Sequence, residues 1–143
     1  MDYIDYKILK YLKLNARIKA SEISRQIHMS VSAVLERIRK MEANGIIKNY
    51  TIVLDENKIG NTTSALMEVS LDHPKFYESF SNAVKNNNNI SFCYYVTGDF
   101  DFILKIICKS PKELEEIHYK IKNIKGVSKT KTYCILNNIK YDN

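Results

Sequence analysis

The chain has 143 residues, of which 45% are hydrophobic, and it carries a net charge of +6. This length is enough for one domain, or two small ones, with a buried core. No stretch approaches the roughly 20 apolar residues that cross a bilayer, and the N-terminal MDYIDYK lacks the basic-then-apolar layout of a signal peptide. We therefore expect a globular cytoplasmic protein with no membrane partner.

The positive charge is concentrated near the N-terminus. Residues 1–50 contain ten Lys or Arg and five Asp or Glu, whereas residues 51–143 contain twelve and eleven. A local positive field attracts polyanions and makes their binding depend on salt. This charge could belong to a solvated lysine-rich surface without a specific role. The functional interpretation is a nucleic-acid-binding domain at this end of the chain.

The first residues have the periodicity of two helices. Apolar residues repeat at helical spacing in Asp2–Leu14, where Asp2 and Asp5 lie near the positive end of the helix dipole, and again in Ala20–Ile27. Lys19 occupies the cap position of the second helix, where Ser or Thr is favoured. We therefore expect the second helix to begin without a side-chain cap.

The segment Met29–Gly45 predicts a third helix with one apolar side and one polar, basic side. Ser30 is a suitable N-cap, and Asn44-Gly45 supplies a left-handed stop. Two helices joined by a tight turn, the second carrying small and basic residues, indicate a helix-turn-helix with a recognition helix. The residues expected to face double-stranded DNA, with the two arginines as the strongest candidates, are Ser30, Ser32, Ala33, Glu36, Arg37, Arg39 and Lys40.

The pattern changes after Gly45. Asn49–Leu54 is rich in β-branched and aromatic residues, which predicts a strand. Asp55–Thr63 has no periodicity and contains Gly60. We therefore expect a DNA-binding domain at residues 1–50, a strand and linker at 51–63, and a second domain at 64–143.

The second domain alternates strands with helices. We expect strands at Ser64–Leu71, Ile90–Thr97, Phe100–Lys109 and Val127–Leu136, with helices at Pro74–Lys85 and after the capping box Ser110-Pro111-Lys112-Glu113. Gly98-Asp99 suits a short hairpin turn between the second and third strands. The order βαββαβ predicts a ferredoxin-like sheet with both helices on one face, so the chain as a whole is an α+β protein.

The two middle strands carry apolar or aromatic residues on both faces. Two helices cover only one face, so the other face would expose a large apolar patch unless a second subunit covered it. We therefore expect an oligomer. The three cysteines lie in apolar runs without CxxC spacing, and we expect reduced, buried thiols rather than a metal site or a disulfide at Cys93, Cys108 and Cys134.

Taken together, these segments resemble the Lrp/AsnC family, the leucine-responsive or feast/famine transcription regulators. The likeness is carried by DYIDYKILKYLKLNARIKASEIS and LERIRKMEANGIIKNYT and, more specifically, by YYVTGDFDFILKI and KGVSKTKTYCIL. It covers essentially the whole chain. The resemblance implies a homodimer formed through the sheet domains, often assembled into octamers. It also implies a regulator that bends DNA, represses or activates transcription, and responds to an amino acid or related small effector without a cofactor.

The resemblance places the effector site near the turn that joins the second and third strands. An amino acid carries an ammonium and a carboxylate, and this turn offers anionic acceptors beside exposed backbone amides. The effector-binding residues that we expect are Thr97, Gly98, Asp99 and Asp101. In the alternative interpretation, Gly98 and Asp99 only form the turn and Asp101 only begins a strand.

Besides the missing cap at Lys19, the chain departs from the family pattern at two further positions of the helix-turn-helix. His28 stands where the family usually has glycine, so a non-glycine residue would have to adopt a left-handed backbone. Val31 replaces a frequent proline at the start of the recognition helix. Both departures concern the exact pose of that helix.

Other functions have weaker support in the sequence. The three histidines lie in different segments, and no phosphate-binding loop, zinc-protease or serine-hydrolase motif occurs, so we do not expect an enzyme. The segment DFILKIICK lacks the basic-glycine-aromatic signature of RNA-recognition modules. The remaining alternative is an amino-acid-sensing ferredoxin-like module without specific DNA binding, against which the basic first domain argues.

Overall fold

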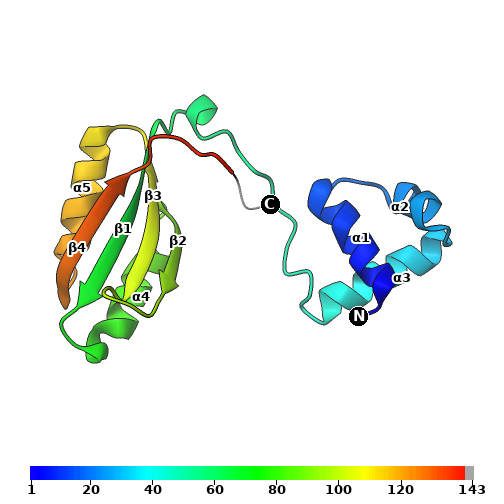
Figure 1. The fold of residues 1–143 in the computed structure, drawn as a ribbon, viewed down its shortest axis with the longest axis horizontal. Coiled ribbons are helices and arrows are strands. Elements are labelled where there is room, and N and C mark those ends of the chain that lie inside the picture. The colour runs from blue at the N-terminus through cyan, green and yellow to red at the C-terminus, as the bar shows by residue number, and fades with distance from the viewer. Residues whose placement is uncertain (141–143) are drawn as a thin grey trace. The chain divides into compact units, whose positions relative to one another are not determined.

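The computed structural model describes residues 1–140. They form two compact units, Met1–Val53 and Leu54–Lys140 (Figure 1). None of the helices within these residues has the length and apolar character needed to cross a membrane.

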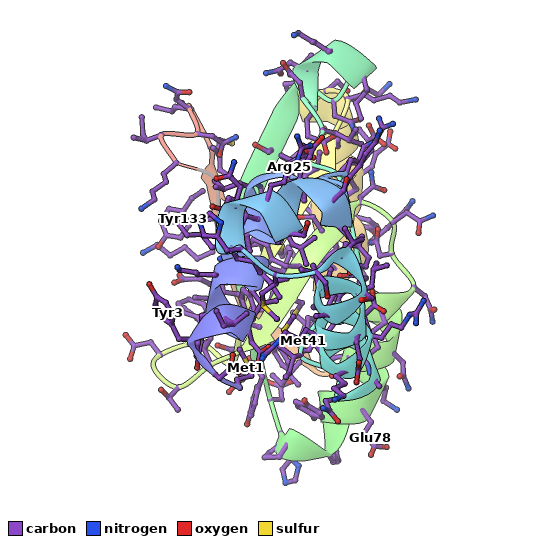
Figure 2. The ribbon with its side chains drawn as sticks, turned by 90° about the vertical axis from the view of Figure 1, so that its right-hand side faces the viewer. Met1, Tyr3, Arg25, Met41, Glu78 and Tyr133 are labelled. Atoms are coloured by element: carbon purple, nitrogen blue, oxygen red, sulfur yellow. The ribbon has the colours of Figure 1, made fainter. Side chains whose placement is uncertain are left out.

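The first unit contains three helices around a small core. They are α1 (Tyr3–Leu14), α2 (Ala20–Ile27) and α3 (Val31–Ala43), and they confirm the three predicted helices. Figure 2 shows Tyr3 extending outward from α1, whereas Met41 lies on the inner side of α3. The buried residues that hold the three helices together are Ile8, Ile23, Ile27, Val34 and Met41.

The helix ends follow the local sequence. The side chain of Asp2 caps α1 in a reciprocal capping box with Asp5, and α2 begins at Lys19 without a side-chain cap, as predicted. Ser30 Oγ accepts a hydrogen bond from the backbone N–H of Ala33 at 3.2 Å, which confirms the N-cap of α3. His28 lies between α2 and α3 with φ 56° and ψ 46°. The left-handed turn is therefore formed by a non-glycine residue, at a cost of about 1 kcal/mol.

The strand predicted at Asn49–Leu54 is wrong, because the structure has no regular element there. The side chains of Ile52 and Val53 are 73% and 65% exposed. A strand needs a neighbouring strand to satisfy its backbone hydrogen bonds, so β-branched composition does not form one alone. After this segment comes a single 3₁₀ turn at Asn57–Ile59.

The second unit is a four-stranded antiparallel sheet with two α-helices. Its elements are β1 (Thr63–Leu71), α4 (Tyr77–Lys85, preceded by a 3₁₀ turn at Pro74–Phe76), β2 (Ile90–Tyr95), β3 (Phe102–Cys108), α5 (Pro111–Lys122) and β4 (Val127–Cys134). The strand order is β2-β3-β1-β4. This confirms the predicted ferredoxin-like fold.

Alternation along β1 separates the two faces of the sheet. Ala65, Met67 and Val69 have no exposed surface and pack with Phe80 of α4 and Ile117 of α5. Both helices therefore cover the same face, and in Figure 1 they lie behind the sheet. The other face, which we call the open face, carries Leu66, Glu68, Phe92, Tyr94, Ile103, Lys105, Ile107, Lys129, Lys131 and Tyr133.

Three details of the second unit differ from the predictions. The open face mixes apolar residues with lysines, so it is not a continuous apolar patch. Cys134 is exposed rather than buried, because it ends the edge strand β4, whereas Cys108 is buried. The cap of α5 is shifted: Ser110 Oγ accepts from Glu113 N as predicted, but Glu113 Oε2 accepts from Lys109 N, one residue before the cap.

Gly126, between α5 and β4, offers a test of the packing against the 3₁₀ turn Pro74–Phe76. Its φ is 93°, and a Cβ atom there would collide with the ring of Phe76. Gly60 has the same φ in the same unit, but a Cβ there would meet no atom within 4 Å. We expect Gly60→Ala to lower the free energy of unfolding by about 1 kcal/mol and Gly126→Ala by about 3 kcal/mol. Urea unfolding measures both, and equal losses would contradict the contact with Phe76.

Candidate DNA-binding and effector sites

The exposed side of α3 is polar. Val34 and Met41 anchor the helix in the core, whereas Ser32, Glu36, Arg39 and Lys40 are exposed and Ala33 is half-buried. Lys40 Nζ lies 3.0 Å from Glu36 Oε1, and this hydrogen bond holds the pKa of Glu36 below its usual value. Small and charged side chains on one edge of a helix are suited to the major groove of DNA.

Arg37 is bound within the protein. Its Nη1 lies 2.7 Å from Asp2 Oδ2 and 2.7 Å from Asp5 Oδ1, and we call this three-residue arrangement the clasp. The pKa values of both carboxyls are lowered, first by the backbone N–H groups of the capping box and then by the hydrogen bonds from Arg37. The clasp joins the start of α1 to the middle of α3.

A second contact fastens the segment that follows α3. Tyr50 Oη donates a hydrogen bond to Glu42 Oε1 at 2.7 Å. Burial and the neighbouring carboxylate raise the pKa of Tyr50 to about 12, so its hydroxyl remains a donor throughout the neutral range. The end of α3 is therefore tied to the beginning of the linker.

The loop between β2 and β3 is longer than the predicted short turn. It runs over residues 96–101 and is closed by a hydrogen bond from Val96 N to Asp101 O at 2.8 Å. Gly98 has φ 131°, which glycine adopts far more readily than other residues. The prediction of a tight hairpin at Gly98-Asp99 alone is therefore wrong.

Three of the four expected effector residues lie at one cavity of about 320 Å³ on the open face. Thr97, Gly98 and Asp99 come from the loop, and the strands contribute Glu68 and Lys131. The remaining lining residues are Val96, Phe100, Ile103 and Tyr133. The cavity thus places two carboxylates and one ammonium around a space large enough for a small zwitterion.

The strand residues of this cavity are held by their register. Glu68 of β1 pairs directly with Lys131 of β4, and Tyr133 Oη donates to Glu68 Oε2 at 3.2 Å. The neighbouring Tyr133 hydroxyl, followed by Glu68, raises the pKa of Lys131, which keeps its ammonium charged. Sequence reasoning missed these three residues because Glu68 lies 65 positions before Tyr133 in the chain. The alternation of β1 and β4 was visible, but their mutual register was not.

Asp101 lies apart from the other expected effector residues. Its Oδ2 accepts a hydrogen bond from Leu71 N at 2.8 Å, and its backbone N–H donates to Val69 O at 3.0 Å. It borders a different cavity of about 390 Å³, lined also by Leu71, Pro74, Tyr77 and Tyr95. Asp101 therefore fastens the loop to β1 beside its bulge at Ser70/Leu71.

Known families match both units of the chain. Residues 1–48 match a winged helix-turn-helix DNA-binding domain, and residues 64–143 match the Lrp/AsnC ligand binding domain. Among curated relatives, the HTH-type transcriptional regulator LrpC of Bacillus subtilis is 33% identical, over 97% of this chain and 94% of that protein. The leucine-responsive regulatory protein of Escherichia coli is 30% identical, over 100% of this chain and 89% of that protein.

Solved structures agree with these matches. The structure of E. coli AsnC has a TM-score of 0.92 and 26% identity, covering 100% of this chain and 97% of that one. The structure of B. subtilis LrpC has a TM-score of 0.89 and 32% identity, covering 99% of each chain. With a helix-turn-helix followed by a ligand-binding sheet matched along its whole length, the chain belongs to the Lrp/AsnC family of DNA-binding transcriptional regulators.

Proposed function

We propose that this regulator binds double-stranded DNA through the exposed side of α3 and that an amino acid bound beside the β2–β3 loop controls its activity. The proposed effector site rests on one observation: Lys131 lines the same cavity as the carboxylates of Glu68 and Asp99. Residues 51–63 serve as the linker between the two functional parts.

The proposed DNA-facing residues surround the N-terminal half of α3 and its polar edge. Ser30 caps the helix where backbone N–H groups favour a phosphate, and Arg39 is suited to a guanine edge or a phosphate. Arg37, also expected at DNA, is bound to Asp2 and Asp5 in the clasp. The proposed set is Ser30, Ser32, Ala33, Glu36, Arg39 and Lys40.

Arg39→Ala tests this DNA-facing surface. If Arg39 neutralises a phosphate, the slope of log affinity against log salt should fall in magnitude by about 0.9, and affinity at low salt should fall about tenfold. Fluorescence anisotropy with a labelled duplex selected from a random library measures both. Lys85→Ala removes one positive charge from α4 and should change neither the salt slope nor the affinity. Equal effects of the two variants would contradict the assignment of Arg39 to the DNA-facing surface.

The effector proposal follows from the chemistry of an amino acid. Lys131 supplies a cation for the carboxylate, while Asp99 and Glu68 supply acceptors for the ammonium. Gly98 has no side chain, which lets a ligand approach the backbone. The name of the E. coli relative, leucine-responsive regulatory protein, agrees with an amino acid as the ligand class.

A thermal-shift screen with the twenty amino acids tests the cavity. A ligand that binds only the folded protein at 100 times its dissociation constant adds about 2.7 kcal/mol of stability, which raises the melting temperature by several degrees. Asp99→Asn and Lys131→Gln should abolish the shift, whereas Lys129→Gln, two residues away on the same face, should preserve it. A shift that survives Asp99→Asn and Lys131→Gln would place the ligand elsewhere. Ligand binding without any DNA binding would favour the alternative of a sensing module.

We also propose a homodimer formed through the open face. Phe92 and Tyr94 stack with ring centroids 5.0 Å apart, and Tyr94 pairs in register with Ile103. This apolar centre has lysines around it, which is the composition of a contact surface with an apolar core and a polar rim.

Ile103→Lys tests this dimer. An additional buried cation at the centre of the interface should convert the protein to a monomer at micromolar concentration. Analytical ultracentrifugation measures the mass. Leu14→Lys, at an exposed position of α1, makes the same chemical change outside the sheet and should leave the mass unchanged. A parent protein that is already monomeric would refute the dimer directly.

A further inference from the structure

We propose that Arg37 is a positioning residue: it holds the recognition helix α3 in its DNA-reading orientation by binding Asp2 and Asp5, and it does not contact DNA itself. The inference rests on the proposed role of α3 at DNA. The proposed function depends on which residues α3 presents to DNA, whereas the role of Arg37 is to hold α3 in place.

The hydrogen bonds of the clasp form a closed set. Asp2 Oδ1 accepts from Asp5 N at 3.0 Å, and Asp5 Oδ2 accepts from Asp2 N at 2.9 Å. The other oxygen of each carboxylate accepts from Arg37 Nη1 at 2.7 Å. All four carboxylate oxygens are thus used, and the Nη1 side of the Arg37 guanidinium is bound to the start of α1 by two charge-assisted hydrogen bonds.

The clasp lies where apolar packing is incomplete. A cavity of about 410 Å³ opens beside it, lined by Asp5 of α1 and by Ala33, Glu36, Arg37 and Lys40 of α3, with Met29, Met41, Asn44 and Ile46 around them. Val34 and Met41 fix the inner side of α3 in the core. On the flank beside the cavity, the ion pairs from Arg37 to α1 add to this packing and oppose rotation of α3 about its own axis.

Orientation matters more for specific than for non-specific binding. Reading a base edge requires hydrogen bonds of defined geometry, whereas non-specific binding depends mainly on the number of phosphates neutralised. Loosening the clasp should therefore weaken binding to a selected sequence and spare binding to random sequence. Removing two carboxylates by itself makes the domain more positive, which would strengthen binding to any DNA. Loosening of α3 therefore predicts weaker binding to the selected sequence, whereas the added positive charge alone predicts stronger binding to it.

The test compares Asp2→Asn/Asp5→Asn with the parent protein on two duplexes, one selected by the parent from a random library and one of scrambled sequence. Asn keeps a capping oxygen at the start of α1 while removing the charge. We expect affinity for the selected duplex to fall about tenfold, a typical effect of losing one good base contact, while affinity for the scrambled duplex is unchanged or increased. Unchanged or increased affinity for both duplexes would overturn the proposal.

Arg37→Gln provides a second, independent variant that leaves the capping box of α1 intact. We expect the same loss on the selected duplex and an unchanged salt slope on the scrambled one. A fall of about 0.9 in the magnitude of that slope would show a phosphate contact and overturn the proposal. Arg37→Lys, with a single ammonium facing the two carboxylates, should bind the selected duplex with intermediate affinity.

The matched control is Asp55→Asn. It also removes one carboxylate of an ion pair, because Lys58 Nζ lies 3.6 Å from Asp55 Oδ2, but that pair lies in the linker. It should not change the ratio of affinities for the two duplexes.

Circular dichroism establishes that each variant is folded before binding is measured. A parent protein that binds neither duplex would refute the DNA-binding role itself, an outcome distinct from failure of the clasp.

Discussion

The register of β1 is the constraint on which the second unit depends. Because side chains alternate along a strand, a slip of one residue would move Ala65, Met67 and Val69 from the helix-covered face to the open face. Their complete burial therefore fixes the pairing of β1 with both of its neighbours. The same register sets Glu68 opposite Lys131. The strand that builds the core thus also assembles the strand side of the proposed effector cavity.

Local interactions account for what the sequence predicted well. The helices α1, α3 and α5 follow from apolar spacing and from caps within four residues, such as Ser30 with Ala33 and Ser110 with Glu113. The ferredoxin-like fold was predicted from the chain order βαββαβ rather than from any one strand pairing. Each single helix is determined within a window of about fifteen residues, where propensity and periodicity are informative.

The features that sequence reasoning missed depend on partners that are distant in the chain. Arg37 looked like an available cation because the two carboxylates that bind it lie 35 and 32 residues earlier. Asp101 looked like a ligand contact, but it bonds to a backbone N–H 30 residues away. Asn49–Leu54 had the composition of a strand but has no partner strand in the structure. Residue type alone does not reveal whether a polar group is already satisfied.

Charge counting has the same limit. The excess of positive charge in residues 1–50 predicts attraction to DNA, but it does not show which cations are paired: Arg37 binds Asp2 and Asp5, and Lys40 lies beside Glu36. Exposed ion pairs contribute little to stability, typically below about 1 kcal/mol. In this unit their larger effect is geometric, because they decide which cations are available to phosphate and how α3 is held.

The proposed effector cavity and the proposed dimer face share side chains. Glu68, Ile103, Lys131 and Tyr133 line the cavity and also lie on the open face. A ligand and a second subunit therefore act on the same atoms, and linkage requires each to change the affinity of the other by the same factor. A ligand with equal affinity for monomer and dimer would not shift the equilibrium between them. A dimer binds two half-sites, and the second binding event is intramolecular, so its strength depends on assembly. An effector that changes the dimer equilibrium thereby changes DNA affinity without contacting α3.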